Sequence, residues 1–282
     1  MIDLTGAVLG FALMLGLMFL GFHVAVVMFA TALAGAALIG APIVLAAGTQ
    51  FWGASDNFVL LAVPLFVLLG EILVRSGITD RMYRALAYWL APLPGGLLHT
   101  NIGASALFAA VSGSSVATAA TIGTVALPAF RNRGYDDRLV LGTVAAGATL
   151  GILIPPSINM IIYGAMTNTS VGRLYAAGIV PGLLLTALFM AVVVVVGWLR
   201  PALVGVRQAA PPWRERLRSL LGLLPPFGIF VVVMGSIYAG WATPTESAAV
   251  GVLVALLLAA LERRLSISML HECFIATVQV TA

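Results

Sequence analysis

Long apolar segments follow one another along most of the chain, and they are apolar around the whole circumference of a helix. Residues 179–199 and 250–261 show no alternation of apolar and polar positions, which excludes the strands of an outer-membrane barrel. The pattern predicts membrane helices, each needing about 20 residues. Eight such segments can be placed: residues 4–20, 22–40, 58–74, 100–130, 139–164, 175–199, 220–240 and 247–261.

Composition supports this class. Of the 282 residues, 61% are hydrophobic and 9% are charged, whereas soluble domains have about 25% charged residues. A water-soluble globule is therefore excluded. All fourteen basic residues are arginines, and most lie in loops beside apolar segments, so the net charge of +4 reflects membrane topology and not nucleic-acid binding. Cys273 is the only cysteine, so neither an internal disulfide nor a zinc site of several thiolates is possible.

The arginines indicate that residues 100–130 do not cross the membrane once. The clusters at 131–138 and 207–218 are predicted to be cytoplasmic. A single crossing by 100–130 would then put Arg75, Arg81 and Arg84 outside, against the same rule. The turn formed by Ser112-Gly113-Ser114-Ser115 divides the segment into two arms, each too short for a bilayer core of about 30 Å. We therefore predict a re-entrant helical hairpin entered from the cytoplasm, with the N-terminus of the chain periplasmic; the alternative is a kinked ordinary span.

A second interruption lies within residues 139–164, where Pro155 and Pro156 follow Leu150-Gly151-Ile152-Leu153-Ile154. Each proline removes a backbone donor and clashes with the preceding turn, so the helix is predicted to break. Broken membrane helices offer free carbonyls to a cation and free N–H groups to an anionic substrate. The alternative is a simple proline kink that neighbouring helices accommodate.

Four ordered motifs carry a resemblance to a known family. They are SALFAAVSGSSVATAATIGTVALP at 105–128, AAGATLGILIPPSINMIIYG at 145–164, AGIVPG at 177–182 and ATPTESAAVG at 242–251. Together they resemble the large membrane subunit of tripartite ATP-independent periplasmic (TRAP) transporters, in the ion-transporter superfamily, over essentially the whole chain.

The resemblance implies an all-α polytopic protein of the bacterial inner membrane, which imports an organic acid such as a dicarboxylate, a 2-oxoacid or sialic acid. The expected partners are a small TRAP membrane subunit and a periplasmic substrate-binding protein. No cofactor is expected besides sodium, the coupling ion. Two inverted repeats with an elevator-like movement are implied, and the second repeat looks incomplete, as if the chain were C-terminally truncated. The expected parts are scaffold helices and an interfacial helix (1–99), a transport-domain hairpin and broken helix (100–174), a helix with a cytoplasmic connector (175–219) and the start of the second repeat (220–282).

The hairpin turn and the helix break together suggest a sodium site of uncharged oxygens. Neither segment contains an acidic residue, which favours carbonyls and hydroxyls over a carboxylate proton relay. The metal is expected near Ser112, Ser115 and Gly151. The alternative for each Ser or Thr is a hydroxyl bonded to its own helix. The full set of candidate sodium and substrate ligands is Ser112, Gly113, Ser114, Ser115, Thr118, Thr149, Gly151, Pro155, Pro156, Ser157 and Asn159.

Three smaller predictions concern other parts of the chain. Thr243-Pro244-Thr245-Glu246 is typical of a capping box that opens a helix. Glu71 and Arg75, four residues apart, are predicted to pair. Residues 78–88 suit an amphipathic helix in the membrane interface.

The sequence leaves three alternatives to a transporter that uses a binding protein. They are a symporter of the same superfamily that uses no binding protein, an intramembrane serine protease built on Ser114 and a histidine, and a membrane scaffold without transport. The protease is disfavoured because Ser114 has no nucleophile-elbow pattern and none of His23, His99 and His271 is expected at the depth of the turn. We therefore expect no enzymatic activity.

Overall fold

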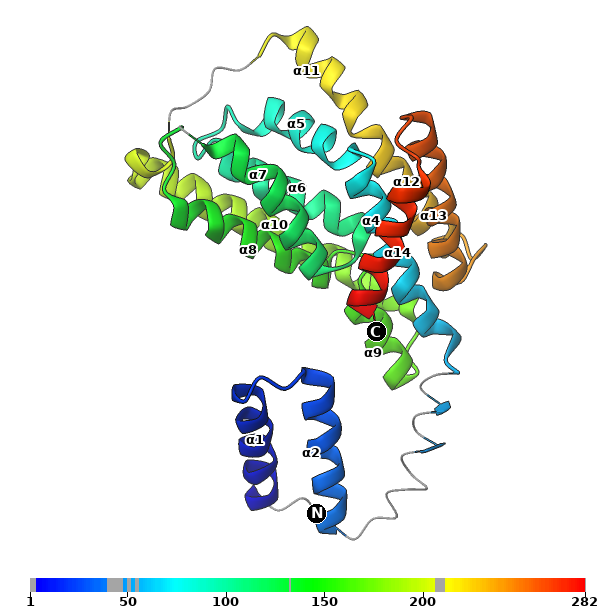
Figure 1. Ribbon diagram of the computed structural model, residues 1–282. Helices are drawn as coiled ribbons and strands as arrows, with labels where there is room; N and C mark the ends of the chain where they lie inside the picture. Colours follow the sequence, from blue (N-terminus) through cyan, green and yellow to red (C-terminus); the bar gives the residue numbers. More distant parts are fainter. Residues whose placement is uncertain are drawn as a thin grey trace. The chain divides into compact units, whose positions relative to one another are not determined.

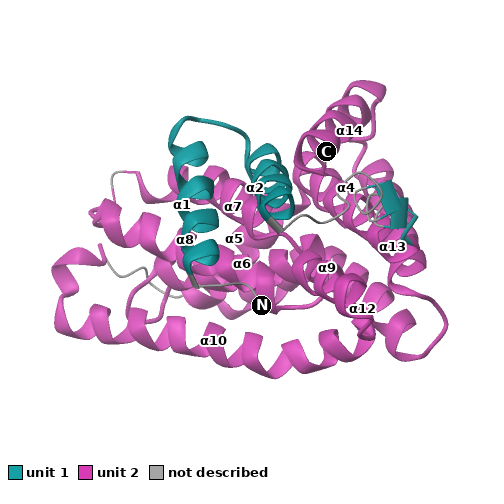
Figure 2. Ribbon diagram, turned by 90° about the horizontal axis from the view of Figure 1, so that it is seen from below, with its two compact units in different colours: residues 1–57 teal, residues 58–282 magenta. Residues whose placement is uncertain are grey.

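The computed structural model describes residues 4–39, 48–49, 52–53, 56–131, 133–205 and 211–281, and these are almost entirely helical (Figure 1). Within them, extended pairing is limited to an isolated bridge between Tyr135 and Val204. The chain divides into two compact units, residues 1–57 and 58–282, coloured separately in Figure 2. The prediction of an all-α protein is confirmed.

The first unit contains α1 (Leu4–Phe19) and α2 (Val24–Ile39), which pack against each other. They coincide with the apolar segments expected at 4–20 and 22–40. Gly21, with φ of +83°, permits the tight turn between them. Both helices expose large apolar side chains such as Phe11 and Phe29, which is typical of surfaces that face lipid or other apolar protein.

The second unit holds α4 to α14, most of which follow the predicted apolar segments, whereas α5, α11 and α14 lie outside them. Its α-helices are α4 (Ala62–Arg75), α5 (Ile78–Leu90), α6 (Leu97–Ser112), α7 (Ser115–Phe130), α8 (Asp137–Leu153), α9 (Ile158–Thr167), α10 (Val171–Leu199), α11 (Trp213–Ser219), α12 (Leu224–Tyr238), α13 (Pro244–Leu261) and α14 (Ile267–Thr281). Short 3-10 turns precede α4 (Phe58–Leu61), follow α10 (Pro201–Leu203) and precede α12 (Leu220–Gly222).

Four of the described segments are long and apolar enough to cross a membrane: Phe58–Arg75, Asp137–Thr167, Val171–Leu199 and Pro244–Leu261. A fifth is added if Trp213–Gly222 and Leu224–Tyr238, which meet at 45°, form one span. The predicted segments 4–20 and 22–40 form helices of 16 residues each, and the segment 100–130 divides into two shorter ones. The chain is a multi-pass membrane protein.

Two hydrophobic cores organise the second unit. One surrounds α4, whose Phe66 and Leu69 are fully buried among α12, α13, α14 and the start of α10. The other surrounds α6, whose Ile102 and Phe108 are buried against α5, α7 and α8. Since α6 packs most extensively on α8, the two interrupted segments of the sequence share this second core.

Helix ends match the predicted local signals. Thr243 caps α13 by accepting a hydrogen bond from the Glu246 N–H (3.3 Å), while the Glu246 carboxylate accepts from the Thr243 N–H (2.7 Å), so the capping box is confirmed. The Glu71–Arg75 pair is also present, at 3.5 Å. The amphipathic helix expected at 78–88 is α5, which buries Ile78, Met82 and other residues on one face.

Candidate functional site

The turn between α6 and α7 is built from a glycine and a capping serine. Gly113 ends α6 in the left-handed conformation, with φ of +63°, which non-glycine residues rarely adopt. Ser114 then starts α7, and its hydroxyl accepts a hydrogen bond from the Ala117 N–H at 3.3 Å. Each helix has 16 residues and is therefore about 24 Å long.

The base of this hairpin is closed by contacts between the start of α6 and the segment after α7. The Leu97 N–H donates to the Tyr135 hydroxyl at 3.1 Å, and the Tyr135 ring meets Phe130 edge-on at 4.8 Å. Burial raises the pKa of Tyr135 above its usual value, so the hydroxyl stays neutral. The two ends of the hairpin thus lie close together, and the prediction of a helical hairpin is confirmed; that it is re-entrant and enters from the cytoplasm stays a prediction.

The break between α8 and α9 covers residues 154–157, as the two prolines predict. Pro155 and Pro156 have no N–H, so the carbonyls of Gly151 and Ile152 have no donor four residues ahead. The Ser157 hydroxyl donates to the Ile152 carbonyl at 2.7 Å and replaces one missing bond. The Gly151 carbonyl is left without a helical donor.

The hairpin turn and the helix break meet backbone to backbone; we call this the tip–break contact. The Ile158 N–H at the start of α9 donates to the Gly113 carbonyl at 3.0 Å. A methyl group on Gly113 would lie 2.6 Å from the Pro156 carbonyl oxygen, and one on Gly151 would lie 2.9 Å from the Ser115 nitrogen. Only glycine fits at either position.

The structure brings most of the predicted ligands to this contact. Ser115 is half-buried, whereas Thr149 and Asn159 are exposed and take no part in the contact; the Thr149 hydroxyl donates to the Ala146 carbonyl at 2.7 Å. Their roles as ligands stay predictions, like those of the others. The predicted ligands that are buried around the tip–break contact are Ser112, Gly113, Ser114, Thr118, Gly151, Pro155, Pro156 and Ser157.

Hydroxyls at the turn are already engaged with the protein. The Thr118 hydroxyl donates to the Ser114 carbonyl at 2.7 Å, and its oxygen lies 3.4 Å from that of Ser112. These bonds agree with the alternative of back-bonded hydroxyls, but each oxygen keeps a lone pair that a cation could use.

Glycines of α10 support the break, and sequence reasoning did not assign them to the site. A methyl group on Gly178 would lie 2.6 Å from the Leu153 carbonyl oxygen, and one on Gly182 would lie 2.8 Å from the Ile154 side chain. These glycines belong to the motif at 177–182 and have the four-residue spacing of close helix packing, a signal that could have identified them. Gly70 of α4 similarly makes room for Ser112.

In the described residues, the ion pairs of charged side chains do not involve the residues of the tip–break contact. Within the described residues no group of three or more His, Cys, Asp or Glu side chains could hold a metal ion. The ion pairs join helix ends instead: Arg81 of α5 with Glu262 after α13 (2.6 Å), and Arg75 of α4 with Glu272 of α14 (3.7 Å). The arrangement can therefore offer carbonyl and hydroxyl oxygens to a hard monovalent cation.

Comparison with known proteins places these features in a family. Residues 11–282 match the family described as "Tripartite ATP-independent periplasmic transporter, DctM component". The chain is 37% identical over 259 residues to the sialic acid TRAP transporter large permease protein SiaM of Vibrio cholerae, covering 90% of this chain and 58% of SiaM. It is 41% identical over 197 residues to the C4-dicarboxylate TRAP transporter large permease protein DctM of Pseudomonas aeruginosa, covering 70% and 45%. A third relative, the ectoine/5-hydroxyectoine TRAP transporter large permease protein UehC of Ruegeria pomeroyi, is 36% identical over 229 residues, covering 79% and 52%. The chain spans about half the length of these relatives.

Proposed function

The chain belongs to the DctM component family of tripartite ATP-independent periplasmic transporters, and on this premise we propose that it forms part of the large permease of a sodium-driven importer of an organic acid. The family is one of transporter permeases, which sets the serine protease hypothesis aside. The proposed partners are a small membrane subunit and a periplasmic binding protein, and the proposed location is the bacterial inner membrane with the N-terminus periplasmic.

The observation that carries the sodium proposal is the Gly151 carbonyl at the tip–break contact, which has no helical N–H donor. Pro155 removes the helical donor of the Gly151 carbonyl, and Gly151 itself lies against the Ser114–Ser115 backbone. Sodium is a hard cation that prefers such oxygens, and a buried carbonyl without a donor gains from a cation that replaces it. Hydroxyls of Ser112 and Ser115 would complete the coordination.

Two observations support a proposal for the substrate class: the neighbouring start of α7 and the names of the relatives. The first N–H groups of α7 have no intrahelical acceptors, and the helix dipole favours a negative group there. A carboxylate at the first turn of α7 would exploit both. Relatives are named for sialic acid, C4-dicarboxylates and ectoine compounds, and we propose a carboxylate-bearing substrate of this kind.

An elevator-like movement is proposed from the two cores. The hairpin and α8 share the core around α6, whereas α12, α13 and α14 share the core around α4. The two groups meet at the hairpin tip, where Val111 of α6 packs into the core around α4 and Gly70 of α4 faces Ser112, so the proposed rigid-body movement would separate this contact.

The proposed sodium role is tested by Pro155→Ala in the full-length permease, reconstituted with its partners in proteoliposomes. Alanine restores an N–H that can bond the Gly151 carbonyl, so the sodium concentration for half-maximal uptake should rise about tenfold, which corresponds to about 1.4 kcal/mol. Pro181→Ala is the matched control, because Pro181 also lies inside a helix, α10, but is exposed. An unchanged sodium dependence in Pro155→Ala, with normal uptake, would count against the proposal.

A further inference from the structure

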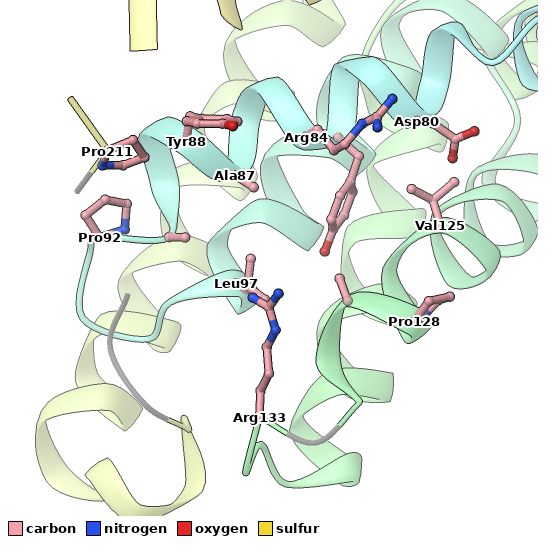
Figure 3. A pocket seen from close by; sticks show the side chains of 13 residues that line it. Asp80, Arg84, Ala87, Tyr88, Pro92, Leu97, Val125, Pro128, Arg133 and Pro211 are labelled. Atoms are coloured by element: carbon pink, nitrogen blue, oxygen red, sulfur yellow. The ribbon is translucent and has the colours of Figure 1, made fainter. Parts of the chain in front are cut away.

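A cavity of about 710 Å³ lies at the base of the hairpin, apart from the tip–break contact (Figure 3). Its walls come from α5, from Leu97 at the start of α6, and from Val125, Pro128 and Ala129 near the end of α7. The volume falls in the range of small-molecule sites, about 300–1,000 Å³. The cavity is therefore large enough for a small molecule, and it lies between α5 and the base of the hairpin.

Two guanidinium groups line this cavity without acidic partners. Arg84 comes from α5 and Arg133 from the segment after α7, and both are exposed. Neither forms an ion pair with another residue in the described part of the chain, whereas Arg81, one turn from Arg84, is held by Glu262 at 2.6 Å. In Figure 3 the Arg133 side chain extends toward Leu97. Asp80 is the one carboxylate of the lining, so the charged side chains sum to +1.

The remainder of the wall is mostly apolar and firmly held. Ala87, Leu97 and Pro128 present carbon surface beside the arginines. Tyr83 is 3% exposed, and its hydroxyl donates to the Asn101 side-chain oxygen at 2.7 Å. Asn101 of α6 thus holds the Tyr83 side chain in place, and the Tyr83 hydroxyl proton is already used in this bond and not offered to a ligand. Arginine pairs bind phosphate through forked N–H groups, and an apolar wall next to them suits a hydrocarbon chain.

From this combination we propose that the cavity binds a phosphate group, supplied by the headgroup of an anionic phospholipid whose acyl chain lies along the apolar wall. The arginines of this region are predicted to be cytoplasmic, where anionic lipids attract basic side chains and basic pockets between helices bind their headgroups. A bound lipid would bridge α5 and the hairpin base. The proposal does not depend on the sodium site or on the identity of the substrate.

The test is retention of lipid by the full-length permease, purified in detergent and equilibrated with equal amounts of phosphatidylglycerol and phosphatidylcholine. Native mass spectrometry should show phosphatidylglycerol retained by the unmodified protein, and about tenfold less on the Arg84→Gln/Arg133→Gln variant. Arg218→Gln, which removes an exposed arginine of α11 outside the cavity, should retain lipid as the unmodified protein does.

A second variant keeps the charges and removes the space. Ala129→Phe should fill the cavity and lower phosphatidylglycerol retention although both arginines remain; it also carries the comparison if the double variant fails to fold. Excess inorganic phosphate distinguishes a lipid headgroup from free phosphate as the ligand. If phosphate does not displace the lipid, the site is assigned to the headgroup. If phosphate displaces the lipid, the site is assigned to a phosphate group that free phosphate can also supply. Equal retention by the unmodified protein and both cavity variants, or equal retention of phosphatidylcholine, would overturn the proposal.

Discussion

Single glycines decide whether the two interrupted segments can touch. Gly113 needs its left-handed φ of +63° to turn the chain, and Gly151 needs the absence of a side chain to approach Ser114 and Ser115. A methyl group at either place would meet backbone atoms, which cannot move aside as a flexible side chain can. The tip–break contact therefore depends on the absence of a side chain at Gly113 and Gly151.

Gly151→Ala tests this dependence. The new methyl group would force the hairpin turn away from α8, and overpacking of this kind costs about 1–3 kcal/mol. We expect sodium-dependent uptake in proteoliposomes to fall about tenfold or more, with the protein still present in the membrane. Gly142→Ala is the control: it lies in the same helix, and a methyl group there would meet nothing within 4 Å. Equal uptake by both variants would contradict the assignment.

A buried polar chain links three helices at the next scale. The Tyr83 hydroxyl of α5 donates to the Asn101 side-chain oxygen of α6 at 2.7 Å, and the Asn101 amide donates to the Thr143 hydroxyl of α8 at 3.0 Å. Burial raises the pKa of Tyr83 well above its usual value, so it remains a neutral donor. Because buried polar groups are costly when unpaired, this chain favours one arrangement of α5, the hairpin and α8.

Tyr83→Phe should therefore destabilise the protein, because the Asn101 oxygen loses its donor while remaining buried. The expected loss is about 1–3 kcal/mol in the free energy of unfolding, seen as a lower thermal midpoint of the full-length permease in detergent. Tyr88→Phe provides the comparison, since Tyr88 lies on the same helix and is 36% exposed. If the two variants unfold at the same temperature, the polar chain does not hold the helices.

For the whole molecule, the central question is how the hairpin lies in the membrane. The start of α6 and the end of α7 lie together through Leu97 and Tyr135, so a membrane placed across the chain should leave both ends of the hairpin on one side. The arginine pattern predicts that this side is cytoplasmic.

Labelling of single cysteines by a membrane-impermeant maleimide tests this topology. In a Cys273→Ala background, which removes the only cysteine, Asp80→Cys and Arg131→Cys should both react only from the cytoplasmic side. Trp241→Cys, in the exposed turn between α12 and α13, should react only from the periplasmic side. Labelling of positions 80 and 131 from opposite sides would show that residues 97–130 cross the membrane.

The sequence by itself determined most of the helices and both interruptions, whereas α11 and α14 lie outside the predicted segments. Continuous apolar runs predict membrane helices. Gly113, Pro155 and Pro156 change backbone hydrogen bonds only within one or two turns of their own positions. Residues close together in the sequence were therefore sufficient to predict both the helices and their interruptions. It also determined the capping box at Thr243 and the family resemblance, which the match over residues 11–282 confirmed.

Only the tertiary structure decided which residues meet. It separated Thr149 and Asn159 from the tip–break contact, added Gly178 and Gly182 of α10 behind the break, and joined Tyr83 to Asn101. These outcomes depend on the rotation of each helix about its axis. That rotation is set by packing between segments far apart in the sequence, and an apolar helix with hydrophobic residues on every side carries little local record of it.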